Sequence, residues 1–391
     1  MNVKILNNDI QEFINQNLNE NLTKLILKGS SFKEITIQEI VGQIISKKKC
    51  KTKLPTWFHT KNIYYPKKVN IEQTSSEITA KYKTNLISGN SIIDITGGFG
   101  VDCLAFSKKL NQVTHCEINE ELSKIVKHNY QQLNIENINC IPIDGVHYLK
   151  TIKKTYDWIY ADPSRRNEEK GKVFLLKDCL PNIPLNLDLL FQFTDNILLK
   201  LSPILDISAS INELKYIKEI HIIAIKNEVK ELLFILQKGY QKTINIKTIN
   251  IKNNYNEFFD AQINSNSKAT FSLPKKFLYE PNTAILKAGV FNDVSQQFKI
   301  DKLHNNSHLY TSNILIYFPG RRFIVKHILP YDRKQIKKVL PSLKANITTR
   351  NFPETVNKIR KRTGIKEGGE NYLFFTTNID NKHQVLVCKK V

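Results

Sequence analysis

Three features that mark membrane, secreted and metal-binding proteins are missing from this chain of 391 residues. No apolar run reaches the roughly 18 residues that a membrane-spanning helix needs, and the first residues, MNVKILNNDI, lack a signal-peptide pattern. The six cysteines include no Cys-x-x-Cys pair, and the nine histidines form no cluster with ligand spacing. We therefore expect a cytoplasmic protein with reduced, mostly buried thiols, no membrane partner and no metal site.

Acidic residues are scarce relative to basic ones. The chain has 36 Asp and Glu against 58 Lys and Arg, a formal net charge of +22. This excess predicts attraction to a polyanion, either nucleic acid or an anionic membrane surface. It is uneven, because residues 319–391 hold 17 Lys and Arg against 5 Asp and Glu, whereas residues 91–162 hold 7 against 9. The C-terminal end is therefore the expected polyanion binder.

Internal repeats and low-complexity tracts are also absent, and the length suggests two to four domains. The first 50 residues have helical spacing, with apolar residues recurring every three or four positions: Ile10, Phe13, Ile14, Leu18, Leu22 and Leu25. A later helix is expected to begin near Glu77, capped by Thr74, Ser75 or Ser76.

From residue 91 the pattern changes to apolar runs of strand length, which cover 91–96, 112–118, 138–143, 157–161, 196–202 and 219–225. Helical segments such as 119–133 separate the first runs, which predicts an α/β fold with a parallel, Rossmann-like sheet. Residues 226–251 are ambiguous, since NEVKELLFIL fits a helix or a strand and TINIKTINI alternates as an edge strand does. The polar stretch 253–275 predicts a linker.

The first predicted strand runs into the segment DITGGFGVDC, residues 94–103. A glycine-rich loop between a strand and a helix lets the backbone approach a ligand closely. Its spacing does not match the Gly-x-Gly-x-x-Gly pattern of dinucleotide sites, and Asp94 ahead of the glycines would repel a pyrophosphate. S-adenosylmethionine (SAM) fits better, because it carries a sulfonium and an ammonium and no phosphate. The alternative is a tight turn with a capping Asp.

Acidic residues also follow the next two predicted strands. Glu117 ends the second strand, where a Rossmann-like sheet offers a carboxylate to ribose hydroxyls, and Asp144-Gly145 ends the third, where an acid can accept from the adenine amino group. Each alone fits a turn or a cap, but parallel strands bring their carboxyl ends to one edge. The predicted SAM-binding residues are Asp94, Thr96, Gly97, Gly98, Phe99, Gly100, Asp102, Glu117, Asp144, Gly145 and Asp162.

The fourth predicted strand ends in Asp162-Pro163-Ser164-Arg165, on the same edge and facing the expected position of the methyl group. We expect these four residues to be catalytic, with Asp162 positioning or deprotonating the methyl acceptor. The alternative is an Asp-Pro turn followed by two surface arginines, Arg165 and Arg166.

With these residues in this order, residues 88–203 resemble the class I SAM-dependent methyltransferases. The Asp162-to-Arg165 segment is similar to the Asp-Pro-Pro-aromatic motif of members that methylate exocyclic nitrogens, in which the Asp and a backbone carbonyl hold the target amine. Here Ser164 and Arg165 replace the second proline and the base-stacking aromatic. Arg165 would instead stack on a base or pair with a phosphate.

The whole chain resembles a narrower bacterial family through the segments EQTSSEITAKYK (72–83), DPSRR (162–166), YEPNTAILKAG (279–289), FPGRRF (318–323) and RNFPETVNKIRKRTGIKEGG (350–369). The resemblance implies a helical N-terminal region at 1–85, a SAM methyltransferase domain at 86–255, a small ferredoxin-like domain at 270–318 and a basic THUMP-like domain at 319–391. The last two are expected to be small α+β domains. THUMP domains are associated with RNA-modifying enzymes, so the resemblance implies an RNA substrate.

The basic C-terminal segment supports an RNA partner independently, because Lys and Arg contact phosphates without reading sequence. The alternative is a solvated helical face. The predicted RNA-binding residues are Arg321, Arg322, Arg350, Lys358, Arg360, Lys361, Arg362 and Lys366. Phe352, Tyr372, Phe374 and Phe375 fit base stacking, but alternation in YLFFTT is more typical of a core strand.

The leading hypothesis is thus a SAM-dependent methyltransferase that modifies tRNA or rRNA by direct displacement at the sulfonium methyl group. A second hypothesis keeps SAM but makes the acceptor a small molecule or a protein. A third is a non-catalytic RNA-binding protein with a methyltransferase fold, which the altered Asp-Pro-Ser-Arg motif favours and the intact carboxyl edge opposes.

Overall fold

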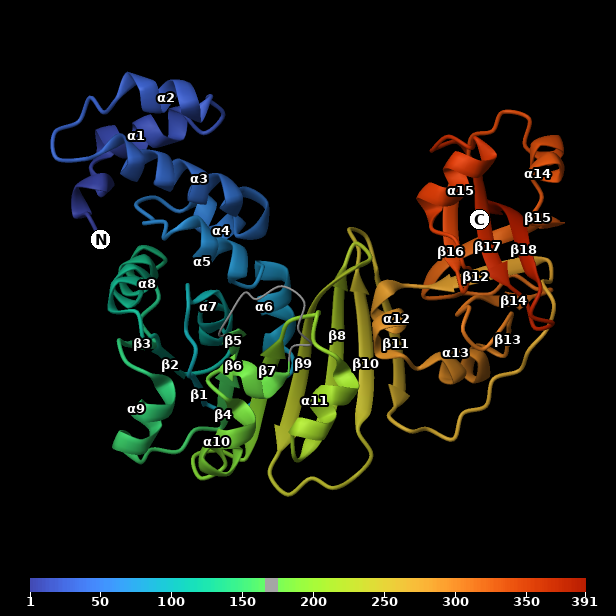
Figure 1. Cartoon of the computed structure of the whole chain (residues 1–391). Coiled ribbons are helices and arrows are strands. Elements are labelled where there is room, and N and C mark those ends of the chain that lie inside the picture. Colours follow the sequence, from blue (N-terminus) through green and yellow to red (C-terminus); the bar gives the residue numbers. More distant parts are fainter. Residues whose placement is uncertain (166–174) are drawn as a thin grey trace. The chain divides into compact units, whose positions relative to one another are not determined.

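A computed structural model describes residues 1–165 and 175–391 of the chain (Figure 1). It divides into two compact units, one formed by residues 1–217 and 233–241 and the other by residues 218–232 and 242–391.

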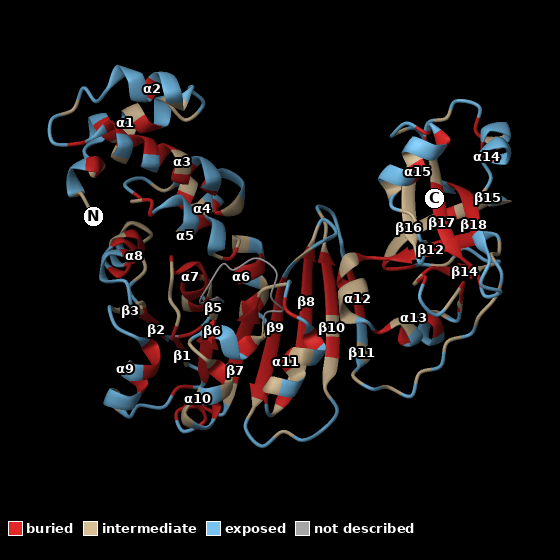
Figure 2. Cartoon of the chain, viewed as in Figure 1, coloured by how far each residue is buried: buried red, intermediate tan, exposed pale blue. Residues whose placement is uncertain are grey.

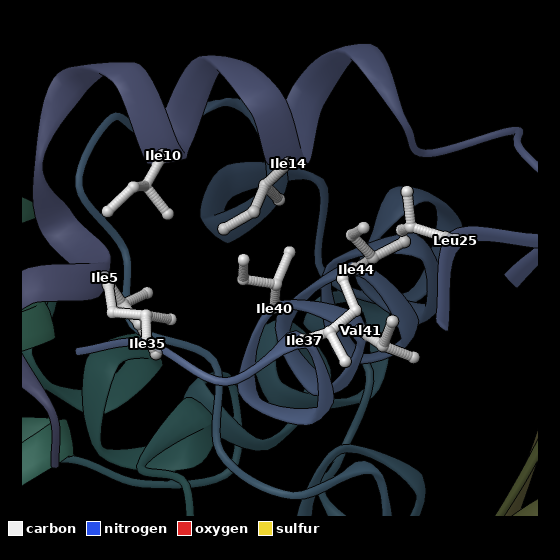
Figure 3. Close-up of a cluster of buried hydrophobic side chains, with 9 residues drawn as sticks. All are labelled: Ile5, Ile10, Ile14, Leu25, Ile35, Ile37, Ile40, Val41 and Ile44. Atoms are coloured by element: carbon white, nitrogen blue, oxygen red, sulfur yellow. The ribbon is translucent and has the colours of Figure 1, made fainter. Parts of the chain in front are cut away.

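The N-terminal part of the first unit is helical, as expected. Its helices are α1 (Asn8–Gln16), α2 (Leu22–Lys28), α3 (Ile37–Lys53), α4 (Pro55–His59), α5 (Lys68–Gln73) and α6 (Glu77–Thr84), after a short 3-10 turn, η1 (Val3–Leu6). Thr36 and Glu39 form a capping box that starts α3. Apolar side chains of α1, α2 and α3 point toward one another and form one small core (Figure 3), made of Ile5, Ile10, Ile14, Leu25, Ile35, Ile37, Ile40, Val41 and Ile44.

The rest of the first unit is a parallel sheet with helices between the strands. The strands are β1 (Ser91–Asp94), β2 (Gln112–Cys116), β3 (Ile138–Ile141), β4 (Trp158–Ala161), β7 (Asn196–Leu201) and β9 (Glu228–Gln237), of which residues 228–232 belong to the second unit. They follow the order β9-β7-β4-β1-β2-β3, and β7, β4, β1, β2 and β3 pair in parallel. The helices are α7 (Val101–Ser107), α8 (Glu120–Gln132), α9 (Gly145–Ile152), α10 (Ile183–Leu190) and α11 (Ile207–Glu213). The predicted α/β, Rossmann-like sheet is confirmed.

Three strands of the second unit lie in the order β11-β10-β8: β8 (Ile217–Ile225), β10 (Asn245–Ile251) and β11 (Asn256–Gln262). The edge-strand prediction for TINIKTINI was wrong, because β11 pairs antiparallel with β10 and covers its outer side. The expected linker at 253–275 also contains a strand, namely β11. The composition did not reveal this strand. Its side chains alternate between exposed ones, such as Asn256 and Phe258, and buried ones, such as Glu257 and Phe259, so polar and apolar residues occur on both sides. NEVKELLFIL, left open above, is strand β9.

The remainder of the second unit is a seven-stranded sheet of order β13-β14-β12-β15-β18-β17-β16 with four helices. Its elements are β12 (Phe277–Pro281), α12 (Thr283–Ala288), α13 (Phe291–Phe298), β13 (Asp301–Lys302), β14 (Tyr310–Ser312), β15 (Gly320–Pro330), α14 (Arg333–Val339), β16 (Asn346–Arg350), α15 (Val356–Thr363), β17 (Asn371–Thr377) and β18 (His383–Lys390). Figure 2 shows β17 and β18 as largely buried, and Phe374 and Phe375 are fully buried. YLFFTT is therefore a core strand.

Across the residues that the structure describes, no helix is both long and apolar enough to cross a membrane. All six cysteines lie in this described part, and none takes part in a disulfide. Within the same part, no three His, Cys, Asp or Glu side chains gather closely enough to hold a metal ion.

Candidate active site at the carboxyl edge of the sheet

The glycines of the loop after β1 are required by the side chains beneath it. A Cβ atom on Gly97 would lie 2.4 Å from the His115 ring, and one on Gly100 would lie 2.0 Å from the Tyr130 hydroxyl. Gly98 and Gly100 also have positive φ angles of 56° and 76°, which favour glycine. At Gly98, by contrast, the nearest atom of the described residues to an added Cβ would be 3.7 Å away. Side chains therefore pack closely against the loop at Gly97 and Gly100, whereas space remains beside Gly98.

Two buried side chains hold this loop by hydrogen bonds. The Tyr130 hydroxyl, from α8, donates to the Gly100 carbonyl at 2.7 Å, and His115 Nε2, from β2, lies 3.3 Å from the Gly98 carbonyl, to which it can only donate. Burial lowers the pKa of His115 to about 4, so the ring is neutral near pH 7. Neither residue was predicted to belong to the site, since the loop carbonyls that they contact are close only in the folded chain.

Asp94 is buried and shapes the loop from its first residue. Its Oδ1 accepts from the Thr96 backbone N–H at 2.8 Å and from the Thr96 hydroxyl at 3.0 Å, and the Cys103 thiol lies 3.4 Å from Oδ2. Burial raises the pKa of Asp94 to about 7, against the lowering effect of the hydrogen bonds from Thr96, and nearby Asp102 raises it further. Near neutral pH this carboxyl group is consequently poised between its charged and neutral forms.

Thr96 connects the loop to the end of β4. Its hydroxyl donates to Asp94 and accepts from the Asp162 backbone N–H at 2.7 Å. A short hydrogen-bonded chain therefore joins the first and fourth strand ends.

The acidic residues after β2 and β3 differ in exposure. Glu117 is half-buried, with Oε2 accepting from the Gly98 backbone N–H at 2.8 Å and Oε1 from the Asn119 N–H at 2.7 Å. Asp144 is exposed and caps α9 by accepting from the His147 N–H at 2.8 Å. Gly145 is needed for packing, because a Cβ there would lie 2.4 Å from the Ile95 Cα atom. Each carboxylate oxygen of Glu117 keeps a lone pair for a further donor.

Two isoleucines beside these acids are unusually exposed. The exposed fraction is 73% for Ile118 and 36% for Ile143. The β2–β3 register pairs Cys116 with Ile141, so each isoleucine lies two residues beyond that pair on neighbouring strands. The sequence analysis did not name them, although their position next to Glu117 and Asp144 offered a signal. Exposed apolar side chains at a predicted ligand edge are suited to cover a flat ring.

Asp162 forms an ion pair that the sequence analysis missed. Its Oδ2 accepts from Lys200 Nζ, and the parallel pairing of Ala161 with Leu199 brings the two residues together on adjacent strands. About one-third of the Asp162 side chain is exposed, against 11% for Lys200. Burial raises the pKa of Asp162, whereas Lys200 opposes that rise. The signal for this pair in the sequence was a lysine inside the apolar run NILLKL.

Asp102 is anchored to the N-terminal helical region. Its carboxylate accepts from Lys83 Nζ at 2.9 Å, from the Ser75 hydroxyl at 2.7 Å and from the Tyr160 hydroxyl at 2.8 Å. Burial alone would raise the pKa of Asp102, but Lys83 and Lys200 lower it overall. Ser75 and Lys83 belong to the segment EQTSSEITAKYK, so this segment attaches α6 to α7, the helix that follows the glycine-rich loop.

Two further predictions near this anchor have clear positions. Phe99, predicted to contact SAM, is buried with its ring centroid 6.0 Å from that of Trp57 in α4. Ser76 caps α6 by accepting from the Thr79 N–H at 3.2 Å, which confirms a helix start at Glu77. Phe99 and Asp102 therefore both face the N-terminal helical region.

The segment after Asp162 is described only in part. Pro163 is half-buried and Ser164 is exposed. Ser164–Arg165 form the short strand β5, which pairs antiparallel with β6 (Cys179–Leu180). The side chain of Arg165 and the whole of Arg166 lie outside the described residues, so their predicted contacts stay predictions.

In the second unit, Arg321 and Arg350 share one buried carboxylate. Arg321 pairs with Glu280 Oε2, and Arg350 Nη2 lies 2.9 Å from Oε1. About one-third of each arginine side chain remains exposed. Arg322 donates to the Ile316 carbonyl at 3.3 Å.

The basic helix α15 carries the other predicted RNA contacts. Arg362 pairs with Glu354 at 2.9 Å and lies over the Tyr331 ring. Arg360 donates to the Ile365 carbonyl at 3.1 Å and is half-buried. The exposed lysines of this region are Lys358, Lys361 and Lys366.

A solved protein from Porphyromonas gingivalis W83 that is assigned to the methyltransferases has the same fold along its whole length. The two chains are 32% identical, the match covers 100% of this chain and 99% of the other, and the TM-score is 0.88. Family models for a ferredoxin-like domain and a THUMP-like domain match residues 277–319 and 320–390. The chain belongs to this methyltransferase family. The resemblance inferred from the sequence motifs is thereby confirmed.

Within the curated proteins, this methyltransferase chain is similar to an uncharacterized RNA methyltransferase of Mycoplasma mobile. The two are 30% identical over 91 residues. The matched part spans 23% of this chain and 25% of the Mycoplasma protein, so the likeness concerns about a quarter of either protein.

Proposed function

We propose that this chain is a SAM-dependent methyltransferase that modifies a nucleotide of structured RNA, either tRNA or rRNA. The observation that carries the proposal is the carboxyl edge of the sheet, where an open Gly98, a fixed Glu117 and the Asp162–Lys200 pair lie on neighbouring strand ends. SAM, when bound, supplies an electrophilic methyl group on a positively charged sulfur. The chain therefore has to bind a cation, align an acceptor and exclude water.

The residues present fit SAM. The free lone pairs of Glu117 suit ribose hydroxyl donors, and Ile118 and Ile143 would cover the two faces of the adenine. The Thr96 hydroxyl donates a hydrogen bond to Asp94. The ionised form of Asp94 favours a ligand of positive charge at the loop. Gly98 leaves room for the ligand against the backbone. We propose these residues as the cofactor site, with Phe99 and Asp102 supporting the loop rather than contacting SAM.

Asp162 is the proposed acceptor-binding residue. Its carboxylate is partly exposed and keeps lone pairs beyond the bond from Lys200. It can thus accept a hydrogen bond from the nucleophilic group and take its proton as the methyl bond forms. Lys200 favours the charged carboxylate that this role needs. Pro163, Ser164 and Arg165 remain proposed neighbours of the acceptor.

Three observations favour RNA as the acceptor. The Mycoplasma relative is described as an RNA methyltransferase, residues 320–390 match a THUMP-like model, and residues 319–391 are strongly basic. We also propose the division into regions at 1–85, 86–255, 270–318 and 319–391. The unbridged cysteines support our placement of the protein in the cytoplasm.

The proposal is tested by incubating the full chain with labelled SAM and RNA from a strain that lacks its gene, followed by nucleoside mass spectrometry. We expect label in one modified nucleoside, and no transfer with Asp162→Asn. SAM binding measured by calorimetry, with no labelled RNA but label in small molecules or protein, would favour the second hypothesis. Binding of RNA without transfer or SAM binding would favour a non-catalytic RNA-binding protein.

A further inference from the structure

A cavity of about 410 Å³ lies in the second unit, and its lining includes none of the residues assigned above to the cofactor. Its lining combines four cationic side chains, one carboxylate, three asparagines and an exposed tyrosine. The lining residues are Lys226, Asn227, Lys252, Asn253, Asn254, Tyr255, Glu257, Gly320, Arg321 and Lys390. The sequence analysis named only Arg321 among them.

The one carboxylate in the lining is neutralised by its neighbours. Glu257 is buried, pairs with Lys252, and accepts from Asn250 Nδ2 at 2.8 Å and from Asn282 Nδ2 at 3.0 Å. Because these three donors satisfy the acid, it does not cancel the positive charge of the remaining lining. An anion entering the cavity therefore meets a net cationic surface.

The wall formed by the β8–β9 turn is fixed by hydrogen bonds. Lys226 and Asn227 both have positive φ angles, of 50° and 66°. The Asn227 backbone N–H donates to Asn250 Oδ1 at 2.8 Å, and its Oδ1 accepts from the Thr283 N–H at 3.0 Å. This turn is thereby attached to β10 and to the start of α12, with exposed Lys226 at its tip. Such preorganisation reduces the entropy lost on binding.

Another part of the lining comes from the segment FPGRRF, whose strand pairs with the start of YEPNTAILKAG, and neither segment has a role in the proposed cofactor site. A Cβ on Gly320 would lie 2.1 Å from the Glu280 carbonyl oxygen, so glycine is needed for β15 to approach β12. Arg321, next to it, donates its Nε to Glu280 at 2.5 Å. The guanidinium keeps further donors for a ligand, because Arg carries five N–H groups.

Tyr255 gives the cavity an aromatic surface. Its exposed fraction is 57%, and Lys252 Nζ lies 4.9 Å from the ring centroid and 3.2 Å from the hydroxyl. Lys252 thus contacts both Glu257 and Tyr255 and holds the ring at the rim of the cavity. An exposed aromatic beside cationic groups is the arrangement by which proteins bind single-stranded nucleic acid.

We propose that this cavity binds an unpaired nucleotide of the RNA substrate, with its phosphates against Lys226, Arg321 and Lys390 and its base stacked on Tyr255. The inference rests on the proposed function, since it takes RNA as the substrate. It adds a second RNA-binding site, distinct from helix α15, that is built from parts of the chain far apart in sequence.

The test is filter binding of the full chain to a labelled single-stranded RNA of about 12 nucleotides and to total tRNA, at rising salt. Tyr255→Ala is expected to weaken binding of the oligonucleotide about 5- to 100-fold with an unchanged salt slope, since stacking is uncharged. Lys226→Ala combined with Lys390→Ala is expected to lower the slope of log affinity against log salt by about 1.4, or about 0.7 for each lost phosphate contact on a single strand.

Two matched variants control for general effects on the same strands. Phe258→Ala removes an aromatic that is 58% exposed but lies outside the lining. Lys389→Ala removes a lysine next to Lys390 whose side chain points to the other face of β18. Both are expected to bind RNA like the wild type, and all variants are expected to keep the wild-type melting temperature and SAM affinity.

The outcomes separate this inference from the proposed function. If the wild type binds RNA and transfers methyl groups while Tyr255→Ala and the double lysine variant bind as the controls do, the cavity is not an RNA site and the proposed function stands. If the wild type binds neither RNA probe, both are overturned. The inference is supported if RNA binding is weaker for Tyr255→Ala and for the double lysine variant while both control variants bind like the wild type.

Discussion

At the scale of single residues, Asp94 and Asp162 differ in the groups that oppose the effect of burial on their pKa values. Among the residues that the structure describes, Asp94 accepts hydrogen bonds from Thr96 and forms no ion pair, and burial raises its pKa to about 7. Asp162 has Lys200. The first carboxyl group is therefore sensitive to pH near neutrality, whereas Lys200 and, less strongly, Lys83 oppose the rise in the pKa of the second.

SAM affinity is expected to fall as the pH is lowered through 7, because a cationic ligand favours ionised Asp94 and protonation removes that preference. Calorimetry between pH 6 and 8, in buffers of different ionisation enthalpy, should detect proton release on binding at the acidic end. Asp94→Asn in the same buffers corrects for titration of SAM itself. An identical pH dependence in the variant would rule out the role given to Asp94.

The same shift has a consequence for folding. The folded-state pKa of Asp94 lies above its ordinary value, so its contribution to stability is present at low pH and is lost as the pH rises through about 7. Relative to the wild type, Asp94→Asn should gain stability between pH 5 and 8, as measured by urea unfolding. A stability difference that stays constant over this range would contradict the shift.

Lys200→Met should move the acidic limb of the methyl-transfer pH profile upward, because the main cation that opposes the rise in the Asp162 pKa is removed. Lys200→Arg should restore much of the wild-type profile. The pH dependence of kcat/KM is the measurement. A uniform loss of rate without a shift would mean that Lys200 acts only on structure.

At the scale of elements, the buried Lys83–Asp102 pair attaches α6 to α7, the helix that follows the cofactor loop. Lys83→Met is expected to destabilise the protein by about 3–5 kcal/mol, since it leaves a buried carboxylate unpaired. Adding Asp102→Asn should recover part of the loss. Urea unfolding of both variants and of the double variant gives the coupling energy.

A control for this experiment is Lys124→Met, which removes an exposed pair with Glu120 on α8. Its expected cost is much smaller, because solvent screens an exposed ion pair. Similar losses of unfolding free energy for Lys83→Met and Lys124→Met would show that the buried pair contributes no more to stability than the exposed one.

The elements also show how far the sequence could lead. Strand-length runs and acids at their ends predicted the parallel sheet, because both signals are local. Lys200 and His115 were missed because a polar residue inside an apolar run has no local sign of its partner. Strand β11 was missed because half of its side chains are polar and exposed. Partners such as Glu280 for Arg321 depend on strand pairing, which periodicity alone does not specify.

At the scale of the whole molecule, positive charge is concentrated in the second unit. If RNA binds through α15 and the following loop, replacing Lys358, Lys361 and Lys366 by Gln should lower the salt slope of tRNA binding by about 2 to 3, because up to three fewer counterions are released. Filter binding over a range of salt concentrations measures the slope.

Replacing exposed Lys124, Lys127 and Lys150 by Gln provides a control of equal charge in the first unit. These lysines belong to residues 91–162, which carry more acidic than basic groups. The control should leave the slope unchanged. Equal changes in both triple variants would mean that total charge, rather than the basic C-terminal segment, governs binding.

The position of the Thr96 hydroxyl has a consequence for how the methyl donor and the acceptor would bind. The Thr96 hydroxyl oxygen accepts a hydrogen bond from the Asp162 backbone N–H and its own O–H donates to Asp94, so the proposed cofactor loop and the proposed acceptor residue share one hydrogen-bonded group. If a ligand at one proposed subsite shifts this shared group, reciprocity requires each ligand to change the affinity of the other by the same factor. Donor and acceptor should therefore bind with synergy rather than independently, and Thr96 is the residue through which that synergy passes.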